Sequence, residues 1–501
     1  MSDRNTQDTP DFAAGIAADR LRPGQPLLGR VGEDEVVLVR HEGGIAALSA
    51  KCTHLGATLD KGLVTEGQIR CPWHHARFSL ADGTAVGGPA VAPLSCYPVS
   101  EAGGRVTVGP KPDRPGTPGR SGPAERIVIV GTGAAGHALA AALGRAGRGR
   151  GVTLIGAEDV APYDRTFCSK QYLQGAKSRD ETLLPRDGLR EVTLMTGTEV
   201  TGIDRAARQV VTAQGDRIDY DRLVLATGAA PKVPDFPGAR RGHVLRSLAD
   251  ADALIEAAGR ARAAVVLGAS FIGLEAAAAL KARGLEVTVV ADDPVPLARI
   301  LGTEAGRFVQ GLHEENGVRF RLGTSVESFD GRSVRTAEGA QLAADLLVLG
   351  TGVAPRVALA EAAGLDLAEG GVAVDATLAT SDPAIWAIGD IAAHPDPATG
   401  RLRRIEHWVH AERQGEHLAQ DFLAGRATAF AAAPFFWSGH FGTQLRYVGH
   451  ARPETVEIDG SLAEGDFAIR YRDGGGSALL TCGRDRLSLE EEHRREPVAA
   501  E

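Results

Sequence analysis

The chain has 501 residues, enough for three or four domains with sizeable cores, and its formal net charge of −9 argues against nucleic acid as the main partner. No apolar stretch reaches the length of a membrane span, and the first ten residues are polar, unlike a signal peptide. Five cysteines are too few and too scattered for a disulfide scaffold. We therefore expect a cytoplasmic protein.

Residues 11–109 are predicted to form a small β-rich domain that carries two metal-ligand boxes. Apolar runs at 36–39 and 45–48 are typical of short strands, and the boxes Cys52-Thr-His54 and Cys71-Pro-Trp-His74 follow. Two thiolates and two imidazoles from two loop tips suit a Rieske [2Fe–2S] cluster, in which cysteines hold one iron and histidines the other. Zinc also accepts a Cys2His2 set, although the spacing of a zinc finger is absent.

The segments around these boxes resemble soluble Rieske ferredoxins and the Rieske domains of ring-hydroxylating oxygenases. High-potential Rieske proteins carry an extra cysteine in each box and hydroxyl donors to the cluster sulfurs. The matching positions here lack both, so we expect a lower reduction potential. His75 falls outside the ligand spacing and is expected at the surface or behind the ligands. The positions that lack these groups are Ala57, Trp73, Ala76 and Phe78, and the similar segments are 56–62, 71–79 and 87–90.

Residues 110–123 are predicted to be a linker. The stretch from Gly109 to Pro123 contains five prolines and four glycines, so it buries nothing and is expected to be semi-extended. Such a tether could let the N-terminal domain dock and swing away, and a passive spacer is equally compatible with it.

The segment after the linker carries a dinucleotide-binding fingerprint. An apolar strand at 127–130 ends in Gly131-Thr-Gly133-Ala-Ala135-Gly136, and an alanine-rich helix is expected over 137–143. Glycines let a pyrophosphate approach the backbone and the helix N-terminus. A second strand is predicted at 152–155, and Glu158 lies about twenty residues past the turn, where an acid holds a ribose hydroxyl.

The fingerprint recurs later in the chain. A strand at 264–267 runs into Gly268-Ala-Ser270-Phe-Ile272-Gly273-Leu-Glu275, in which Ser270 replaces the middle glycine. The next strand, 287–290, ends in Ala291 where NAD sites usually carry an acid, and Asp292 and Asp293 follow. No arginine stands at this point to take a 2′-phosphate, which favours NADH over NADPH.

From about residue 124 to 495 the chain resembles NADH-dependent ferredoxin reductases of oxygenase systems and apoptosis-inducing-factor-like flavoproteins. With the Rieske boxes in front, it is most similar to the Rieske-fused, apoptosis-inducing-factor-3-like branch. The resemblance implies an α/β flavoprotein with two dinucleotide-binding domains, an all-β Rieske domain before them and a small C-terminal α/β domain. The implied boundaries are 124–246 and 366–430 for the FAD domain, 247–365 for the NAD(P)H domain and 431–496 for the C-terminal domain.

The resemblance also implies which residues bind cofactors. The metal ligands are Cys52, His54, Cys71 and His74. The FAD site takes Gly131, Gly133, Ala135, Gly136, Glu158, Arg165, Lys170, Ala226, Thr227, Gly228, Asp390, His407, Trp408 and Trp437; the nicotinamide site takes Gly268, Ser270, Ile272, Gly273, Glu275 and Gly352. Solvated charges for Arg165 and Lys170, a helix cap for Asp390 and core aromatics for the two tryptophans are the competing interpretations.

The function implied is electron transfer from NADH, or NADPH, through FAD and the Rieske cluster to a Rieske oxygenase or small redox protein, with no acid–base residue in a catalytic role. Two alternatives stay open: an NADH oxidase or peroxidase, and a redox-sensing or scaffold flavoprotein. Cys168 is single, which disfavours dithiol chemistry and leaves a sulfenate role or a buried structural thiol. A homodimer is compatible with all of these.

Overall fold

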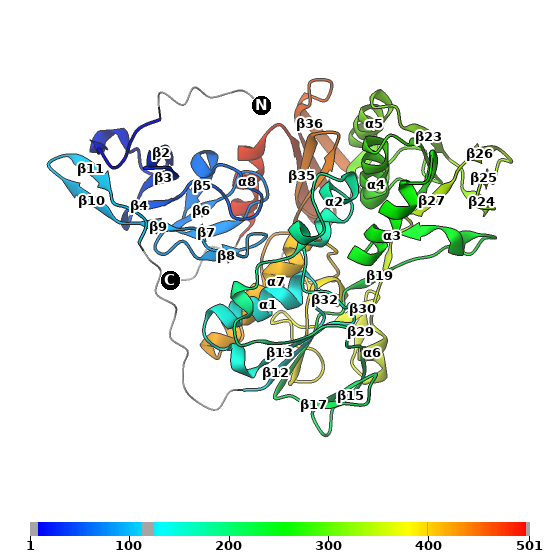
Figure 1. Ribbon diagram of the computed structural model, residues 1–501, viewed down its shortest axis with the longest axis horizontal. Coiled ribbons are helices and arrows are strands. Elements are labelled where there is room, and N and C mark those ends of the chain that lie inside the picture. The colour runs from blue at the N-terminus through cyan, green and yellow to red at the C-terminus, as the bar shows by residue number, and fades with distance from the viewer. Residues whose placement is uncertain (1–8, 113–124, 398, 497–501) are drawn as a thin grey trace.

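The computed structural model describes residues 9–112, 125–397 and 399–496. The predicted linker lies mostly outside these ranges, so its role as a tether stays a prediction. Within them, no helix is both long and apolar enough to cross a membrane. The chain forms an N-terminal β unit (residues 9–109), two parallel-sheet units and a C-terminal unit, arranged as Figure 1 shows.

The β unit is built from three small sheets. The two predicted apolar runs lie in β3 (Asp34–His41) and β4 (Gly44–Ser49), which pair antiparallel. The two ligand boxes lie in loops, one after β4 and one between β6 and β7, so their side chains are free to converge. The other strands are β1 (Ile16–Ala17), β2 (Leu27–Val31), β5 (Leu63–Thr65), β6 (Gln68–Arg70), β7 (Arg77–Ser79), β8 (Ala85–Gly87), β9 (Cys96–Tyr97), β10 (Val99–Ala102) and β11 (Arg105–Val108).

The first parallel-sheet unit contains the first glycine turn. Its sheet has the strand order β14-β13-β12-β18-β31, and the helices α1 and α7 pack against each other beside it. All four residues of β12 are buried, as expected for a central parallel strand. The elements are β12 (Ile127–Val130), β13 (Val152–Ile155), β14 (Thr193–Met195), β18 (Arg222–Leu225), β31 (Ile385–Ala387), α1 (Ala134–Arg145) and α7 (Trp408–Ala424).

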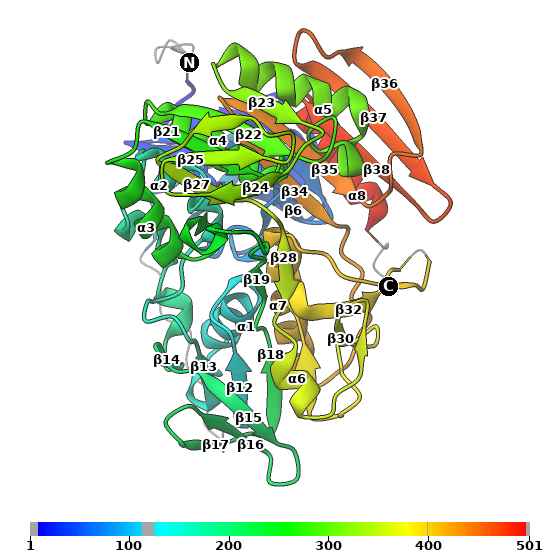
Figure 2. The ribbon, with the colours of Figure 1, turned by 90° about the vertical axis from the view of Figure 1, so that its right-hand side faces the viewer.

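The second parallel-sheet unit contains the second glycine turn, and its sheet has the order β20-β27-β21-β22-β23. Strand β20 starts at His243, four residues before the expected domain boundary at 247. Figure 2 shows β19 and β28, an antiparallel pair, between the two parallel-sheet units. The elements are β19 (Ala229–Pro231), β20 (His243–Val244), β21 (Ala263–Leu267), β22 (Glu286–Ala291), β23 (Arg319–Leu322), β27 (Leu346–Leu349), β28 (Val353–Pro355), α4 (Phe271–Ala282) and α5 (Ala298–Glu315).

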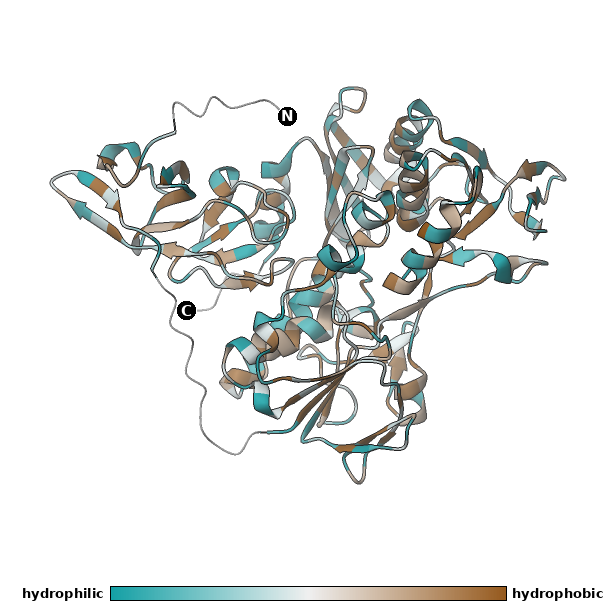
Figure 3. Cartoon of the chain, in the orientation of Figure 1, coloured by the Kyte–Doolittle hydropathy of each residue, from teal (hydrophilic) through white to brown (hydrophobic). Residues whose placement is uncertain are grey.

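The C-terminal unit is a five-stranded antiparallel sheet followed by a helix. The helix α8 (Asp485–Arg495) packs on this sheet and also reaches β5 of the β unit (Figure 1). Figure 3 shows the apolar strands of both parallel sheets enclosed between more polar helices and loops. The strands are β34 (Phe435–His440), β35 (Thr443–Gly449), β36 (Thr455–Ser461), β37 (Asp466–Asp473) and β38 (Gly476–Cys482).

Candidate cofactor sites and the interface between them

The first glycine turn has the close backbone approach that the fingerprint predicts. Gly131 has φ +121°, and a Cβ on it would lie 2.0 Å from the carbonyl oxygen of Ala226. A Cβ on Gly136 would lie 1.9 Å from the carbonyl oxygen of Gly131, so helix α1 can sit on the strand only without a side chain here. Gly133 precedes the first turn of α1, whose free N–H groups suit a pyrophosphate. Ala135 is buried within that turn.

Glu158 and Arg165, two predicted FAD ligands, form an ion pair with each other. Tyr163 donates a hydrogen bond of 2.6 Å to Glu158 and accepts one of 2.6 Å from Arg165. Arg165 also lies beside Gly133, since its Nε is 3.9 Å from where a Cβ on that glycine would be. The pair therefore spans the space between the turn and the end of β13. A ribose or phosphate that enters here meets one anionic and one cationic side chain.

The end of β18 and the Gly389-Asp390 corner complete this side of the unit. Thr227 donates to the carbonyl oxygen of Arg356 at 2.9 Å, and Gly228 has φ +66°. Asp390 is nearly buried and pairs with Arg246, which sequence analysis did not single out. A helix cap, the competing interpretation of Asp390, would not by itself account for this ion pair.

The second glycine turn repeats the first. A Cβ on Gly268 would lie 2.3 Å from the carbonyl oxygen of Gly350, and one on Gly273 would lie 2.1 Å from that of Gly268. Ser270, in place of the middle glycine, donates to the Gly350 carbonyl at 3.0 Å and so ties the two loops together. Ile272 is exposed at the start of α4, and Gly352 has φ +83° with open space around it.

The tip of β22 lies next to an arginine that comes from a later element of the chain. We expected no arginine at this point, yet Arg299 from α5 lies 2.7 Å from Asp293 and 3.6 Å from Asp292. The arginine is six residues past Asp293 in sequence and reaches back because α5 starts close to the strand end. Its charge is already shared between two carboxylates. Ala291, the expected acid position, is buried.

A buried polar network links the second fingerprint to the C-terminal unit. Glu275 on α4 forms a 3.0 Å ion pair with Lys170 and accepts hydrogen bonds from Ser169 at 2.6 Å and from Ser438 at 2.7 Å. Glu275 and Ser438 are almost completely buried. Lys170 is thus neither a solvated surface charge nor free, and its ammonium lies 5.9 Å from the ring centre of Trp437.

The other predicted aromatic residues lie near this network. His407 precedes α7 and stacks on Phe436, with ring centres 4.6 Å apart. Burial lowers the pKa of His407 to about 4, so the imidazole is neutral at pH 7. Trp408 packs against the core of the first parallel-sheet unit, as its core interpretation expects.

The four predicted cluster ligands converge as two pairs. The Nδ1 atoms of His54 and His74 lie 3.1 Å apart, and the side chains of Cys52 and Cys71 are hydrogen-bonded to each other. Two nitrogens bound to one metal at tetrahedral angles lie roughly 3.4 Å apart, close to the observed spacing. Backbone N–H groups of residues 54, 55, 73 and 74 point at the sulfurs. Two cysteines on one side and two histidines on the other fit a two-iron cluster.

The histidine pair faces the C-terminal unit. The ring centre of Trp437 on β34 lies 4.3 Å from that of His74 and 5.9 Å from that of His54. The side chains of His54 and His74 are each only 6% exposed. Trp437 therefore separates the predicted cluster ligands from Lys170 and Glu275. This position explains the residue better than a role in an apolar core alone.

Charged residues behind the ligands hold the β unit in place. His75 is completely buried, which excludes the surface alternative and agrees with a position behind the ligands: its Nδ1 lies 3.1 Å from Glu492 on α8 and its ring stacks on Phe435 at 3.9 Å. Glu492 also accepts from Arg413 at 2.7 Å. Arg70 pairs with Glu496 at 2.5 Å. These contacts join the β unit to α7, α8 and β34.

Several of these residues gave no usable signal in the sequence. Asp164, buried, lies 3.4 Å from Nε2 of His54, and Arg446 donates to the backbone oxygen of Trp73 at 2.8 Å. Ser438 and Arg246 belong to the same group. Each is remote in sequence from its partner, so only the tertiary fold brings them together. The one available hint was Arg165, a predicted FAD residue that directly follows Asp164.

Cys168 is a buried thiol. Burial raises its pKa to about 12. A sulfenate-forming cysteine needs thiolate character and access, and Cys168 has neither. The structural interpretation of this residue is therefore favoured.

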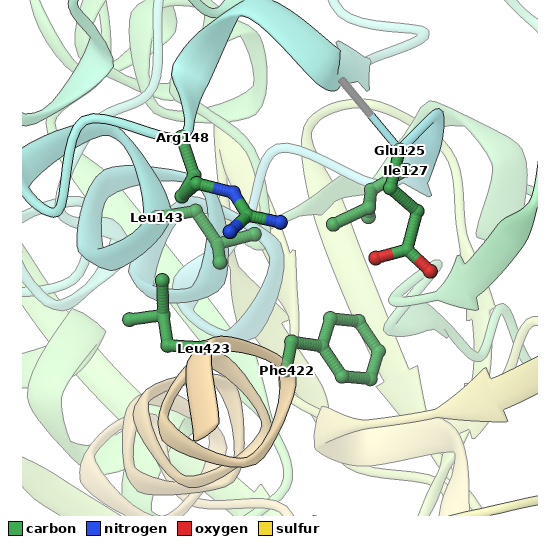
Figure 4. A pocket seen from close by; sticks show the side chains of 6 residues that line it. All are labelled: Glu125, Ile127, Leu143, Arg148, Phe422 and Leu423. Atoms are coloured by element: carbon green, nitrogen blue, oxygen red, sulfur yellow. The ribbon is translucent and has the colours of Figure 1, made fainter. Parts of the chain in front are cut away.

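A small hollow lies at the opposite end of β12 from the glycine turn (Figure 4). Four residues of strand, at ~3.3 Å each, separate it from Gly131 by about 13 Å. It is accordingly no part of the dinucleotide site. Its lining residues are Glu125, Ile127, Leu143, Arg148, Phe422 and Leu423.

Comparison with known proteins extends these observations. Residues 125–415 match the family described as pyridine nucleotide-disulphide oxidoreductase, and residues 13–98 match the Rieske [2Fe-2S] domain. Rhodocoxin reductase of Rhodococcus erythropolis is 38% identical over 354 residues, which cover 68% of this chain and 82% of that protein. Apoptosis-inducing factor 3 of Mus musculus is 31% identical over 476 residues, 90% of this chain and 78% of that protein.

Among solved structures, the covalent putidaredoxin reductase–putidaredoxin complex is similar with a TM-score of 0.70 and 33% identity, covering 75% of this chain and 94% of that one. The ferredoxin reductase of the CYP199A2 system from Rhodopseudomonas palustris gives a TM-score of 0.68 at 34% identity, covering 72% and 93%.

Proposed function

Because the chain belongs to the pyridine nucleotide-disulphide oxidoreductase family and carries a Rieske [2Fe-2S] domain, we propose that it is an NADH-dependent reductase with its own built-in electron carrier. The family implies FAD and NAD(P)H, and the Rieske domain implies a [2Fe–2S] cluster. When bound, FAD accepts a hydride and releases electrons singly, and the cluster carries one electron. An external protein would accept the electrons from the cluster.

The observation that carries this proposal is the position of Trp437. Its ring lies against His74 on one face of the interface and close to Lys170 on the other. A predicted cluster ligand and a predicted flavin-site residue therefore both lie next to one side chain, and these two neighbours, His74 and Lys170, are largely enclosed. An oxidase or a scaffold would need no such junction.

The residues that would hold the cofactors divide between the units. The first glycine turn and Arg165 would bind the FAD pyrophosphate, and Asp390 with Arg246 would bind polar groups nearer the ring. The second turn would bind the nicotinamide coenzyme. We favour NADH, because Asp292 and Asp293 would repel a 2′-phosphate and Arg299 is already paired with both.

The names of several relatives indicate which kind of protein would accept the electrons. Among them are proteins named as ferredoxin–NAD(+) reductase components of the anthranilate and p-cumate dioxygenase systems. We propose that this chain likewise serves a Rieske oxygenase or a small redox protein. We also propose a cytoplasmic location, supported by the lack of any disulfide among the cysteines of the described residues.

An anaerobic NADH titration followed by absorbance and electron paramagnetic resonance (EPR) tests the function. We expect the flavin absorbance to bleach and a reduced Rieske signal to appear. A cluster that stays oxidised while NADH fully reduces the flavin would overturn the proposal. The Cys71→Ser variant is the control: its flavin should bleach without any Rieske signal. Oxygen consumption that is rapid and unchanged in this variant would instead favour an oxidase.

A further inference from the structure

One ring nitrogen of the predicted cluster ligands is left without a hydrogen bond inside the protein. Nε2 of His54 is buried and meets no acceptor in hydrogen-bond geometry. The carboxylate of Asp164, from the first parallel-sheet unit, lies 3.4 Å from it. Both side chains are almost fully enclosed, at 6% and 4% exposure. An anionic group from one domain therefore faces a cluster ligand of another.

Asp164 is held rigidly in this position. Its Oδ1 accepts a hydrogen bond of 2.8 Å from the backbone N–H of Thr166, and its own N–H donates to the carbonyl oxygen of Thr182 at 2.9 Å. Oδ1 and the backbone N–H of Asp164 are thus both occupied by hydrogen bonds within its own unit. Oδ2 remains, and it is the oxygen that faces His54.

The orientation of the histidines assigns their two nitrogens. Because the Nδ1 atoms of His54 and His74 face each other, the metal side of both rings is Nδ1, and Nε2 of His54 points away from the cluster. A metal-bound imidazole usually donates its other N–H to a carboxylate, carbonyl or water, which fixes the ring and makes the ligand more basic. Asp164 is the carboxylate in place for that role.

We propose that Asp164 is a positioning residue that accepts the Nε2–H of His54 and lowers the reduction potential of the Rieske cluster while the domain is docked. The inference rests on the proposed function, since it presumes a loaded cluster. A fixed negative charge disfavours an added electron nearby. Arg446, a cation whose charge acts on Cys71, is already paired with Asp485 at 2.6 Å. Because the carboxylate comes from another domain, docking itself sets the potential.

A potentiometric titration of the loaded, full-length protein tests this. Dithionite and mediators reduce the cluster at fixed pH, and EPR measures the reduced fraction. Asp164→Asn should raise the equilibrium constant for reduction of the cluster by about tenfold. For a one-electron couple this corresponds to an upward shift of ~59 mV in the reduction potential. Asn still offers an oxygen to the Thr166 N–H, so the local cap survives. Asp164→Glu keeps the charge and should retain most of the wild-type potential.

The matched control is Asp187→Asn, which removes one charge from an exposed site of the same unit. It should leave the potential unchanged. If Asp164→Asn does not accumulate with its cluster, Asp164→Ser removes the charge with a different capping group and must give the same upward shift. A loaded neutral variant with wild-type potential would overturn the inference. Since the titration uses no NADH, failure of NADH to reduce the cluster would count against the proposed function alone.

Discussion

Trp437 is the residue on which the proposed electron path depends. It contacts the predicted cluster histidines directly, at 4.3 Å from His74, and lies beside the Lys170–Glu275 ion pair. No other aromatic ring contacts both predicted cluster histidines among the described residues. This side chain thus lies at the boundary between the Rieske domain and the predicted flavin site.

Trp437→Leu should slow cluster reduction by NADH by about tenfold, the effect of losing ~1.4 kcal/mol of well-positioned contact. Stopped-flow absorbance would follow the flavin and cluster separately, and flavin reduction should stay at the wild-type rate. Trp437→Phe keeps an aromatic ring and is the control, with a smaller effect expected. Equal rates of cluster reduction in wild type and Trp437→Leu would show that the electron path does not use this ring.

At the scale of elements, the two glycine turns share the same backbone geometry. In each, a strand ends in a glycine with positive φ, and the helix that follows presses a second glycine onto the first glycine's carbonyl oxygen. The distances from the built Cβ to that oxygen, 1.9 Å at Gly136 and 2.1 Å at Gly273, leave no room for a methyl group. The helix N-terminus can approach the strand end only because the residues at these positions have no side chain.

Gly136→Ala should therefore force α1 away from β12 and cause loss of FAD. We expect purified protein with little yellow colour and a lower stability, by about 1–3 kcal/mol for overpacking. The flavin content and the denaturant midpoint measure the two effects. Gly311→Ala is the matched control: it lies in α5 with open space around it and should stabilise the protein by about 0.5–1 kcal/mol. Normal flavin content in Gly136→Ala would contradict the close-approach argument.

At the scale of the whole molecule, a buried charge network fixes the Rieske domain on the rest of the chain. Glu492 on α8 is completely buried and is shared by Arg413 from α7 and His75 from the Rieske domain. Burial alone would raise the pKa of Glu492, but these two partners outweigh burial and hold it well below its ordinary value. The docked arrangement therefore depends on an ionised carboxylate inside the interface.

Glu492→Gln should lower the free energy of unfolding by about 3–5 kcal/mol at pH 7, because it leaves buried cations uncompensated. Glu490→Gln, on the exposed side of the same helix, should change it by less than about 1 kcal/mol. The pH dependence has a definite sign. A depressed carboxyl pKa stabilises the folded state above the unfolded value of ~4.3 and loses that effect as the pH falls below it.

Denaturation curves at several pH values measure both effects. The difference between wild type and Glu492→Gln should narrow steadily once the pH drops below about 4.3. A difference that stays constant down to pH 3 would mean that Glu492 is not the ionised centre of the interface.

The sequence alone determined the local chemistry of this protein. The paired boxes predicted the ligand types, and β12 and β13 appeared at the predicted residues because a buried strand followed by a glycine turn is a short-range pattern. Family resemblance then supplied the order of domains. Such features depend on neighbours within a few residues, or on motifs whose spacing is fixed.

Only the tertiary structure decided how the parts meet. Asp164 beside His54, Arg246 on Asp390, Arg299 at the tip of β22 and the burial of His75 on α8 all pair residues that are far apart in the chain or on different elements. No local periodicity encodes such pairs, because each depends on how whole domains pack. The function of a two-centre electron carrier depends on that packing, since the distance and charge between its centres come from it.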